Sequence, residues 1–167
     1  GGATDVSVVQ RFVGQEVRTE RPIFDPDRAT LMDFRVPQDR GPHFVYVLPR
    51  SAREALVEDT YFAAPGTEAT DADHVASIDA WLAARRAGAV EVLREERGAL
   101  PMTTLRAPRH ASARVVAIGI AGGAAKPSTG YAFTFIQRAA AGIAAALASG
   151  DLRTVPRLPA VRGKATA

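Results

Sequence analysis

The 167-residue sequence contains no cysteine, a single tryptophan and only two lysines beside 19 arginines. Without cysteine the chain cannot form disulfides, Cys-ligated zinc sites, iron–sulfur clusters or a thiol nucleophile. Its longest apolar run, 115–125, has 11 residues, whereas a transmembrane helix needs about 20. No basic-then-apolar leader is visible. The sequence therefore predicts a cytoplasmic protein with no signal peptide and no membrane-spanning helix.

Nucleotide-binding and metal-binding motifs are also missing. No Gly-x-Gly-x-x-Gly dinucleotide fingerprint occurs, and the glycine-rich stretch near residue 120 lacks the Gly-Lys-Ser/Thr of a Walker A loop. The three histidines show no metal-ligand spacing, so no metal is expected. The net charge of +3 is mild and spread along the chain, which does not indicate a nucleic-acid partner.

What the sequence does contain is typical of a globular chain, with 47% apolar and 23% charged residues. Segments 6–17, 29–36, 43–48 and 55–62 are rich in β-branched and aromatic residues, and turn residues bound them, so they are predicted strands. Their short separators favour antiparallel pairing. Further strands are predicted at 90–96 and at 115–120, the latter fully apolar and therefore buried.

Two helices are predicted. The first spans 71–86, with Thr70 as its N-cap and Val75, Ile78 and Leu82 on one face. The second follows Gly130 and stops at Gly150 (130–150). We expect an α/β chain with a mixed, largely antiparallel sheet and two flanking helices. Residues 1–112 would form a sheet region, and 113–167 a strand, glycine-rich loop and helix that belong to one incomplete domain unit.

The stretch from Val115 to Tyr131 is the most informative. A predicted strand leads into a loop rich in glycine, and a long helix follows at once. Glycines let a backbone approach a ligand closely, and free N–H groups at a helix start favour an anionic or electron-rich group. The alternative is a strand–turn–helix joint whose glycines serve packing. The glycines of the stretch are Gly119, Gly122, Gly123 and Gly130.

A second signal is the adjacent pair Glu58 and Asp59 inside an otherwise apolar strand. Because strand side chains alternate between faces, only one of the two faces any given pocket. A carboxyl facing an apolar pocket has a raised pKa and can serve as a general acid. Taken alone, the pair is better explained by exposure or ion pairing.

A third signal is the charged run 94–97, which precedes Leu100-Pro101-Met102. Alternating charges of this kind usually form a solvated face. His43, His74 and His110 receive no role, and Trp81 is expected in the core.

Together, in this order, these stretches resemble the flavin-dependent lycopene cyclases of the bacterial and plant beta-cyclase family, over about residues 10–151. The matching pieces are Gln10-Arg-Phe-Val-Gly14, Leu31-Met-Asp-Phe-Arg35, Phe44-Val-Tyr-Val-Leu-Pro49, Val57-Glu-Asp-Thr60, Glu95-Glu-Arg-Gly-Ala-Leu-Pro-Met102 and Gly122-Gly-Ala-Ala-Lys-Pro-Ser-Thr-Gly-Tyr-Ala-Phe133.

The resemblance implies part of the FAD/NAD(P)-binding flavoprotein fold shared with aromatic hydroxylases and geranylgeranyl reductases. The family's N-terminal dinucleotide fingerprint is not in the sequence, so we expect a fragment that is inactive alone. Hydroxylases usually read Gly-Asp where this chain has Gly119-Ile120. That departure argues against a hydroxylase and leaves the contact with the flavin ribityl chain in doubt.

The implied reaction is a redox-neutral, acid-catalysed cyclisation of lycopene ends to beta-ionone rings. It requires reduced FAD, with NAD(P)H as reductant, and a peripheral position at the membrane surface, where the apolar carotenoid lies. By analogy with the acidic motif of the plant enzymes, Glu58 is the expected acid, Asp59 the second choice and Glu96 a weaker one. Flavin contacts are expected from Gly119, Gly122, Gly123, Pro127, Thr129, Gly130 and Tyr131.

Two other functions compete with this interpretation. A flavin-dependent prenyl or geranylgeranyl reductase of the same fold would transfer hydride to an alkene and consume reductant. A non-catalytic domain that binds apolar ligands would need no anion-binding site, so the glycine-rich loop before a helix argues against this function.

Overall fold

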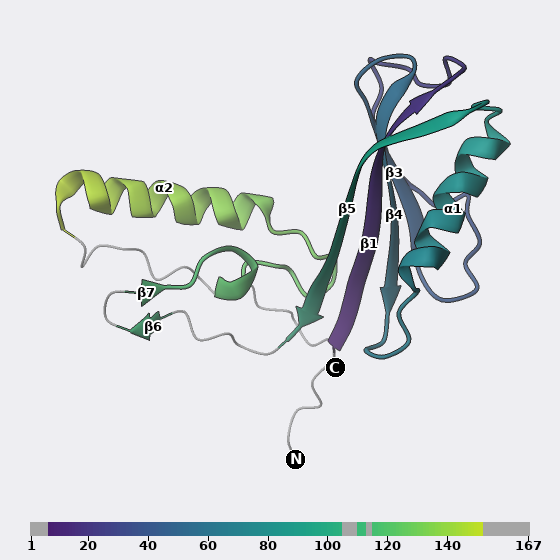
Figure 1. Ribbon diagram of the computed structural model, residues 1–167. Coiled ribbons are helices and arrows are strands. Elements are labelled where there is room, and N and C mark those ends of the chain that lie inside the picture. Colours follow the sequence, from purple (N-terminus) through teal and green to yellow (C-terminus); the bar gives the residue numbers. More distant parts are fainter. Residues whose placement is uncertain (1–6, 105–109, 113–114, 152–167) are drawn as a thin grey trace. The chain divides into compact units, whose positions relative to one another are not determined.

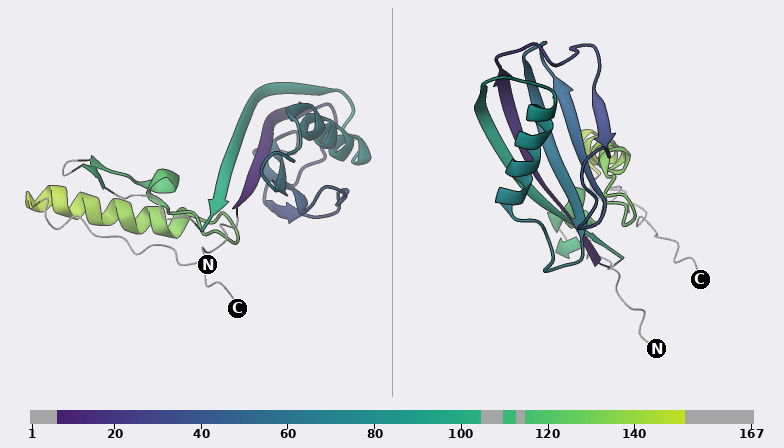
Figure 2. Two further views of the ribbon diagram at one scale, coloured as in Figure 1. Left: turned by 90° about the horizontal axis from the view of Figure 1, so that it is seen from below. Right: turned by 90° about the vertical axis from the view of Figure 1, so that its right-hand side faces the viewer.

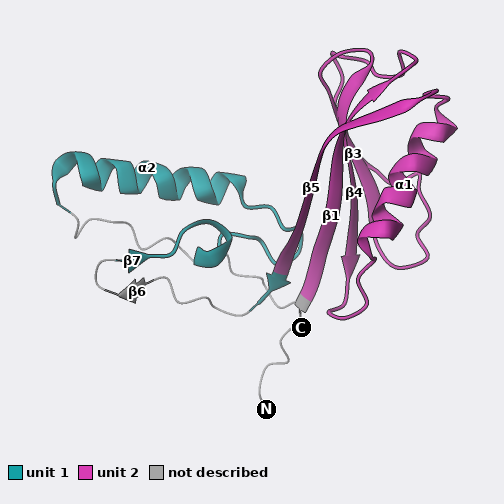
Figure 3. Cartoon of the chain, viewed as in Figure 1, with its two compact units in different colours: residues 1–7, 102–167 teal, residues 8–101 magenta. Residues whose placement is uncertain are grey.

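The structure, a computed structural model, describes residues 7–104, 110–112 and 115–151. The chain divides into two compact units (Figure 3). Val8–Pro101 is called the sheet unit below, and Gly1–Ser7 with Met102–Ala167 the loop–helix unit. Each is described separately.

The sheet unit is a five-stranded sheet with one helix (Figure 1). The strand order is β2-β3-β4-β1-β5, and the pairs β2–β3, β3–β4 and β4–β1 are antiparallel. The five predicted strands of this unit are confirmed, although β5 continues well past the predicted end at Glu96. The elements are β1 (Ser7–Thr19), β2 (Thr30–Asp33), β3 (His43–Pro49), β4 (Glu54–Ala63), α1 (Asp71–Ala84) and β5 (Val90–Thr103).

The core lies between the sheet and α1, which covers one face (Figure 2). We call this the helix face and the opposite side the far face. Alternation places every second residue of β1, β3 and β4 toward the helix. Trp81 is buried there, as expected. The principal contributors are Val13, Val17, Val45, Val47, Ala55, Val57, Ile78, Trp81 and Leu82.

Helix α1 begins with the N-cap that the sequence predicted. The Thr70 hydroxyl accepts a hydrogen bond from the Asp73 backbone N–H at 3.2 Å, and the Asp73 carboxylate accepts one from the Thr70 N–H at 2.8 Å. This reciprocal capping box satisfies two N–H groups that a helix start leaves without partners. The helix ends at Ala84, where Arg86 and then Gly88 adopt positive φ.

The loop–helix unit contains two short strands, a 3₁₀ turn and a long helix. Strand β6 (His110–Ser112) pairs antiparallel with β7 (Val115–Val116), the turn η1 covers Gly119–Gly122, and α2 spans Phe133–Ser149. Gly150, with φ of 72°, ends α2 as predicted. The prediction of a buried strand over 115–120 was wrong: the strand stops at Val116, and Ile118 is 57% exposed. Among the described residues, Val115 and Ile118 remain exposed, and the chain turns at Gly119, where φ is 59°.

Candidate functional site

Glu58 and Asp59 lie on opposite faces of β4. Asp59 pairs in register with the core residues Val13 and Val45, and it is fully buried on the helix face. Glu58 pairs with Gly14 and Tyr46 and therefore lies on the far face. The two carboxyl groups thus sit in different environments.

Asp59 is the centre of a buried polar cluster. Its Oδ1 accepts from His43 Nε2 at 2.5 Å and from the Ser77 hydroxyl at 2.6 Å, and its Oδ2 accepts from His74 Nδ1 at 2.8 Å. Burial alone would raise the pKa of Asp59, but these three hydrogen bonds outweigh it and hold that pKa below its ordinary value. The carboxyl is therefore an ionised acceptor.

His43 connects this cluster to the loop before β3. Nδ1 of His43 lies 2.7 Å from the carbonyl oxygen of Pro37, and its Nε2 faces the Asp59 carboxylate. The cluster thus joins β3 and β4 to α1 through buried hydrogen bonds. His74 uses one nitrogen only, because its Nε2 has no hydrogen-bond partner among the described residues.

The pKa of Glu58 is shifted in the opposite direction from that of Asp59. Burial raises the pKa of its carboxyl, the neighbouring carboxylates of Glu96 and Asp59 add to the rise, and a hydrogen bond from the Thr60 hydroxyl at 3.2 Å opposes it. Of the two adjacent acids, Glu58 is therefore the one whose surroundings favour the protonated form.

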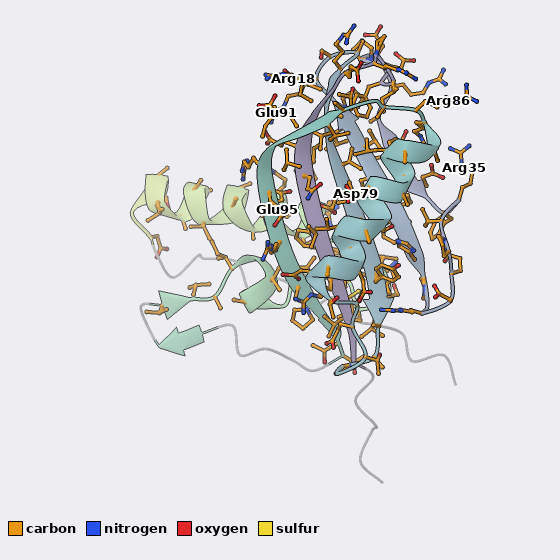
Figure 4. The ribbon with its side chains drawn as sticks, turned by 45° about the vertical axis from the view of Figure 1, so that its right-hand side comes forward. Arg18, Arg35, Asp79, Arg86, Glu91 and Glu95 are labelled. Carbon is orange, nitrogen blue, oxygen red and sulfur yellow. The ribbon has the colours of Figure 1, made fainter. Side chains whose placement is uncertain are left out.

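The far face changes character along β4, with Glu58 between two regions. One end carries ion pairs: Arg18 bonds Glu54 at 2.8 Å and Glu91 at 2.9 Å (Figure 4). The other end is aromatic, and the ring of Phe44 contacts three other rings edge-on, with centroids 5.2–5.5 Å apart. Those rings belong to Phe34, Tyr46 and Phe62.

Glu96 reaches the same face from β5. Its Cγ and Oε1 lie 3.1 and 3.3 Å from the point that a Cβ of Gly14 would occupy, and Gly14 is the register partner of Glu58. Glu95 lies on the helix face instead, where it accepts from Gln15 Nε2 at 3.0 Å and pairs with Arg97. The expected solvated face at 94–97 is thus divided between the two sides of the sheet.

The glycine-rich loop lies in the loop–helix unit, and its backbone turns sharply three times. Gly119, Gly123 and Gly130 have φ of 59°, 74° and 69°, a region that favours glycine. At Gly122 a Cβ would overlap the backbone of Ala117. Close approach of backbone to backbone therefore requires glycine at this position as well.

The chain then leads into the start of α2. A tight turn over Lys126–Gly130, closed by N–H groups of Thr129 and Gly130 that donate to the Lys126 carbonyl, holds Pro127 within it. Tyr131 is half exposed. At the N-cap of α2, Ala132 offers no side-chain hydrogen bond, so its first N–H groups keep their donor capacity.

A pocket of about 450 Å³ lies beside α1 on the helix face, lined in part by His43, Ser77 and Trp81. Its three arginines already have acidic partners. Arg35 and Arg85 bond Asp33, and Arg40 bonds Asp73 at 2.9 Å. The first of these contacts lowers the pKa of Asp33 to about 2. The pocket therefore presents balanced charge and no surplus for an anion.

Sequence reasoning missed the partners of Asp59. His43 has the same strand phase as Val45 and Val47, and His74 lies one helical turn before Ile78, so alternation and helical period could have placed both histidines in the core. In the parts that the structure describes, no group of three or more His, Asp or Glu residues is arranged to hold a metal ion. Likewise, no described helix is both long and apolar enough to cross a bilayer.

The sequence of the chain matches a known protein family. A family model described as lycopene cyclase protein matches residues 3–164. The chain belongs to the lycopene cyclase family. A lycopene beta-cyclase of Paracoccus sp. (strain N81106 / MBIC 01143) is 35% identical over 136 residues, which cover 78% of this chain and 34% of that protein. The lycopene beta-cyclase of Pantoea ananas is 35% identical over 125 residues, 73% of this chain and 32% of that one.

This lycopene cyclase family chain spans about a third of the length of the curated relatives it matches. Among solved structures it resembles a geranylgeranyl bacteriochlorophyll reductase-like protein of Thermoplasma acidophilum. The TM-score is 0.57 at 15% identity, over 88% of this chain and 37% of that protein. The resemblance confirms the predicted fold class.

Proposed function

We propose that the protein carrying this chain is a lycopene cyclase that closes the linear ends of lycopene to beta-ionone rings. The observation that carries the proposal is the position of Glu58, a carboxyl with a raised pKa at the border of an aromatic region. Family membership supports the substrate and the reaction class.

The reaction needs an acid strong enough to protonate an alkene. The protonated Glu58 carboxyl adds its proton to the terminal double bond, and a neighbouring double bond attacks the cation to form the ring carbon–carbon bond. A ring proton then leaves for a carboxylate on the same face. One proton is gained and one is lost, so atoms and electrons balance without net redox change.

The aromatic end of the far face suits the rest of this substrate. Phe12, Tyr46 and Phe62 are half-buried on this face, and Tyr46 lies directly opposite Glu58 in the β3–β4 ladder. Such rings bury an apolar polyene and attract a cation through the negative charge of their faces, by about 0.5–2 kcal/mol per contact. Dry aromatic walls also keep water from capturing the cation.

The loop–helix unit fits a flavin. Its positive-φ glycines expose backbone, and α2 begins without a side-chain cap. We propose that Gly119, Gly122, Gly123, Pro127, Thr129, Gly130 and Tyr131 line the FAD site. When bound there, FAD kept reduced by NAD(P)H would supply an electron-rich group that stabilises positive charge. The carotenoid substrate lives in lipid, so we propose a cytoplasmic protein that works at the membrane surface.

The neighbouring acids take other roles in this proposal. Asp59, ionised and saturated with three donors, holds β4 in register, so that Glu58 faces the substrate. Glu96 lies on the far face against Gly14, the register partner of Glu58, and its charge adds to the rise in the pKa of Glu58. Among the three candidates, the geometry therefore favours Glu58 as the acid.

The test is pigment analysis of the complete protein in a lycopene-accumulating bacterial host. Wild type is expected to yield beta-carotene. Glu58→Gln should reduce cyclic product by about 100-fold or more, the scale of losing a general acid, with FAD still bound. Glu54→Gln, on the same strand and face but within the ion-paired end, is the matched control and should retain activity. Unchanged cyclisation in Glu58→Gln would refute the acid assignment, and a hydrogenated linear product would identify a prenyl reductase instead.

A further inference from the structure

Two carboxyl groups on different strands share one gap on the far face. Strand β1 lies between β4, which carries Glu58, and β5, which carries Glu96. A side chain on β1 would ordinarily separate them. At this level β1 has Gly14, and the Cγ and Oε1 of Glu96 lie only 3.1 and 3.3 Å from the place where a Cβ would stand.

The register brings this gap next to Glu58. Gly14 and Glu58 are directly opposed in the antiparallel β1–β4 ladder, and opposed Cβ positions lie about 4.5–5.5 Å apart. The Glu96 side chain, together with Leu56 Cδ1 at 3.2 Å, thus occupies the space that a side chain at position 14, directly opposite Glu58, would fill. Gly14 has an ordinary strand conformation, with no positive φ, so backbone strain does not require glycine here. What the glycine provides is room.

We propose that Glu58 and Glu96 form a carboxyl pair that holds one proton between them. In this pair Glu96 is the positioning residue that keeps Glu58 protonated, and Gly14 is the gap that brings the two together. The catalytic meaning of the pair rests on the proposed cyclase function. Two carboxylates in one site cannot both ionise freely, because each charge opposes the other.

The other charged groups around the pair decide which partner keeps the proton. Arg94, on the same strand as Glu96, reaches Glu96 at 3.5 Å and Glu16 of β1 at 3.3 Å. Glu16 is also bound by Arg50 at 2.7 Å. The Glu96 side of the pair therefore has a cation within reach.

No described cation bonds Glu58, by contrast. From β3 it faces the Tyr46 phenol, whose pKa is raised by burial and by Glu58 itself. On its own strand it receives the Thr60 hydroxyl, while Asp59 points to the other face. With a cation on the Glu96 side of the pair only, the shared proton stays on Glu58. An isomerisation that takes up and releases one proton per ring suits a pair whose proton count is the same before and after.

The direct test is a titration of this chain with ¹³C-carboxyl-labelled glutamate, followed by NMR. In wild type, Glu58 is expected to titrate above the ordinary glutamate value of about 4.3. In Glu96→Gln, which removes a like charge at nearly constant size, the pKa of Glu58 should fall. Glu95→Gln is the matched control: it removes the adjacent carboxylate, which lies on the helix face, and should leave the Glu58 titration unchanged. An unchanged Glu58 titration in Glu96→Gln would overturn the pair.

Gly14→Val tests the gap itself with the pair's residues intact. Valine suits a strand, and its side chain would push the Glu96 carboxyl aside, so the pKa of Glu58 should fall as in Glu96→Gln. The same Glu58 pKa in Gly14→Val and wild type would show that Gly14 does not bring the two carboxyl groups together.

In the complete protein, the pair also predicts a shift in the pH dependence of cyclisation. Because Glu96→Gln lowers the pKa of the acid, the alkaline limb of the kcat profile should move to lower pH, and Glu96→Asp should restore part of it. An unmoved limb would contradict the pair. The titration needs no activity, so the pair can hold if the protein proves not to cyclise lycopene. Conversely, cyclisation by wild type with an unmoved titration would leave the function standing without the pair.

Discussion

The two units of the chain treat their apolar residues in opposite ways. In the sheet unit, valines from three strands pack against Ile78 and Leu82 of α1, and these residues are almost fully buried. In the loop–helix unit, Phe133 and Leu147 of α2 are each 64% exposed. Burial of an apolar face stabilises the sheet unit, whereas these two exposed side chains of α2 contribute little in the part of the chain that the structure describes. Three substitutions would break or sharpen this comparison.

The largest effect is expected from Asp59→Ala in the sheet unit. It removes the acceptor of the His43–His74–Ser77 cluster and leaves the buried donors of His43 and His74 without their partner, at a cost of about 1–3 kcal/mol each. Urea unfolding followed by the fluorescence of Trp81, the single tryptophan, measures the loss. Asp79→Ala, on the exposed side of α1 (Figure 4), is the control and should change stability little. Equal stabilities for the two variants would show that the cluster contributes nothing.

A smaller effect is expected from Thr70→Ala at the start of α1. The substitution removes the hydroxyl that accepts from the Asp73 N–H and should lower the free energy of unfolding by about 1 kcal/mol. Thr70→Ser keeps that acceptor and should retain most of the stability. The same urea titration decides between them. If Thr70→Ala unfolds at the wild-type midpoint, the capping box does not stabilise the sheet unit.

The smallest effect is expected from Leu147→Ala in α2. Its side chain is mostly exposed, and substitutions at such positions usually stay within about 0.5 kcal/mol. Thermal unfolding followed by circular dichroism at 222 nm measures it in this chain. A loss of 2 kcal/mol or more, the scale of a buried leucine, would show that this face of α2 is covered. The contrast between the two units would then disappear.

How far the sequence predicts the structure differs between the units for the same reason. The strands around 43–48 and 55–62, the Thr70 cap and the stop at Gly150 were all predicted, because alternation, helical period and cap chemistry are local. The buried strand at 115–120 was not found, because burial depends on what packs over a segment. The fully apolar pattern alone could not show that Ile118 would be exposed.

The site divides along the same line. The sequence by itself determined that Glu58 and Asp59 point to opposite faces, since a strand has a period of two, and that a glycine-rich loop leads to a helix start. Only the tertiary structure decided which face each acid received. It gathered His43, His74 and Ser77 around Asp59, and it brought Glu96 against Gly14, the register partner of Glu58. His43, His74 and Ser77 each lie 15 to 18 positions from Asp59 in the sequence. Strand pairing and helix packing, rather than sequence proximity, therefore set the surroundings of the two acids.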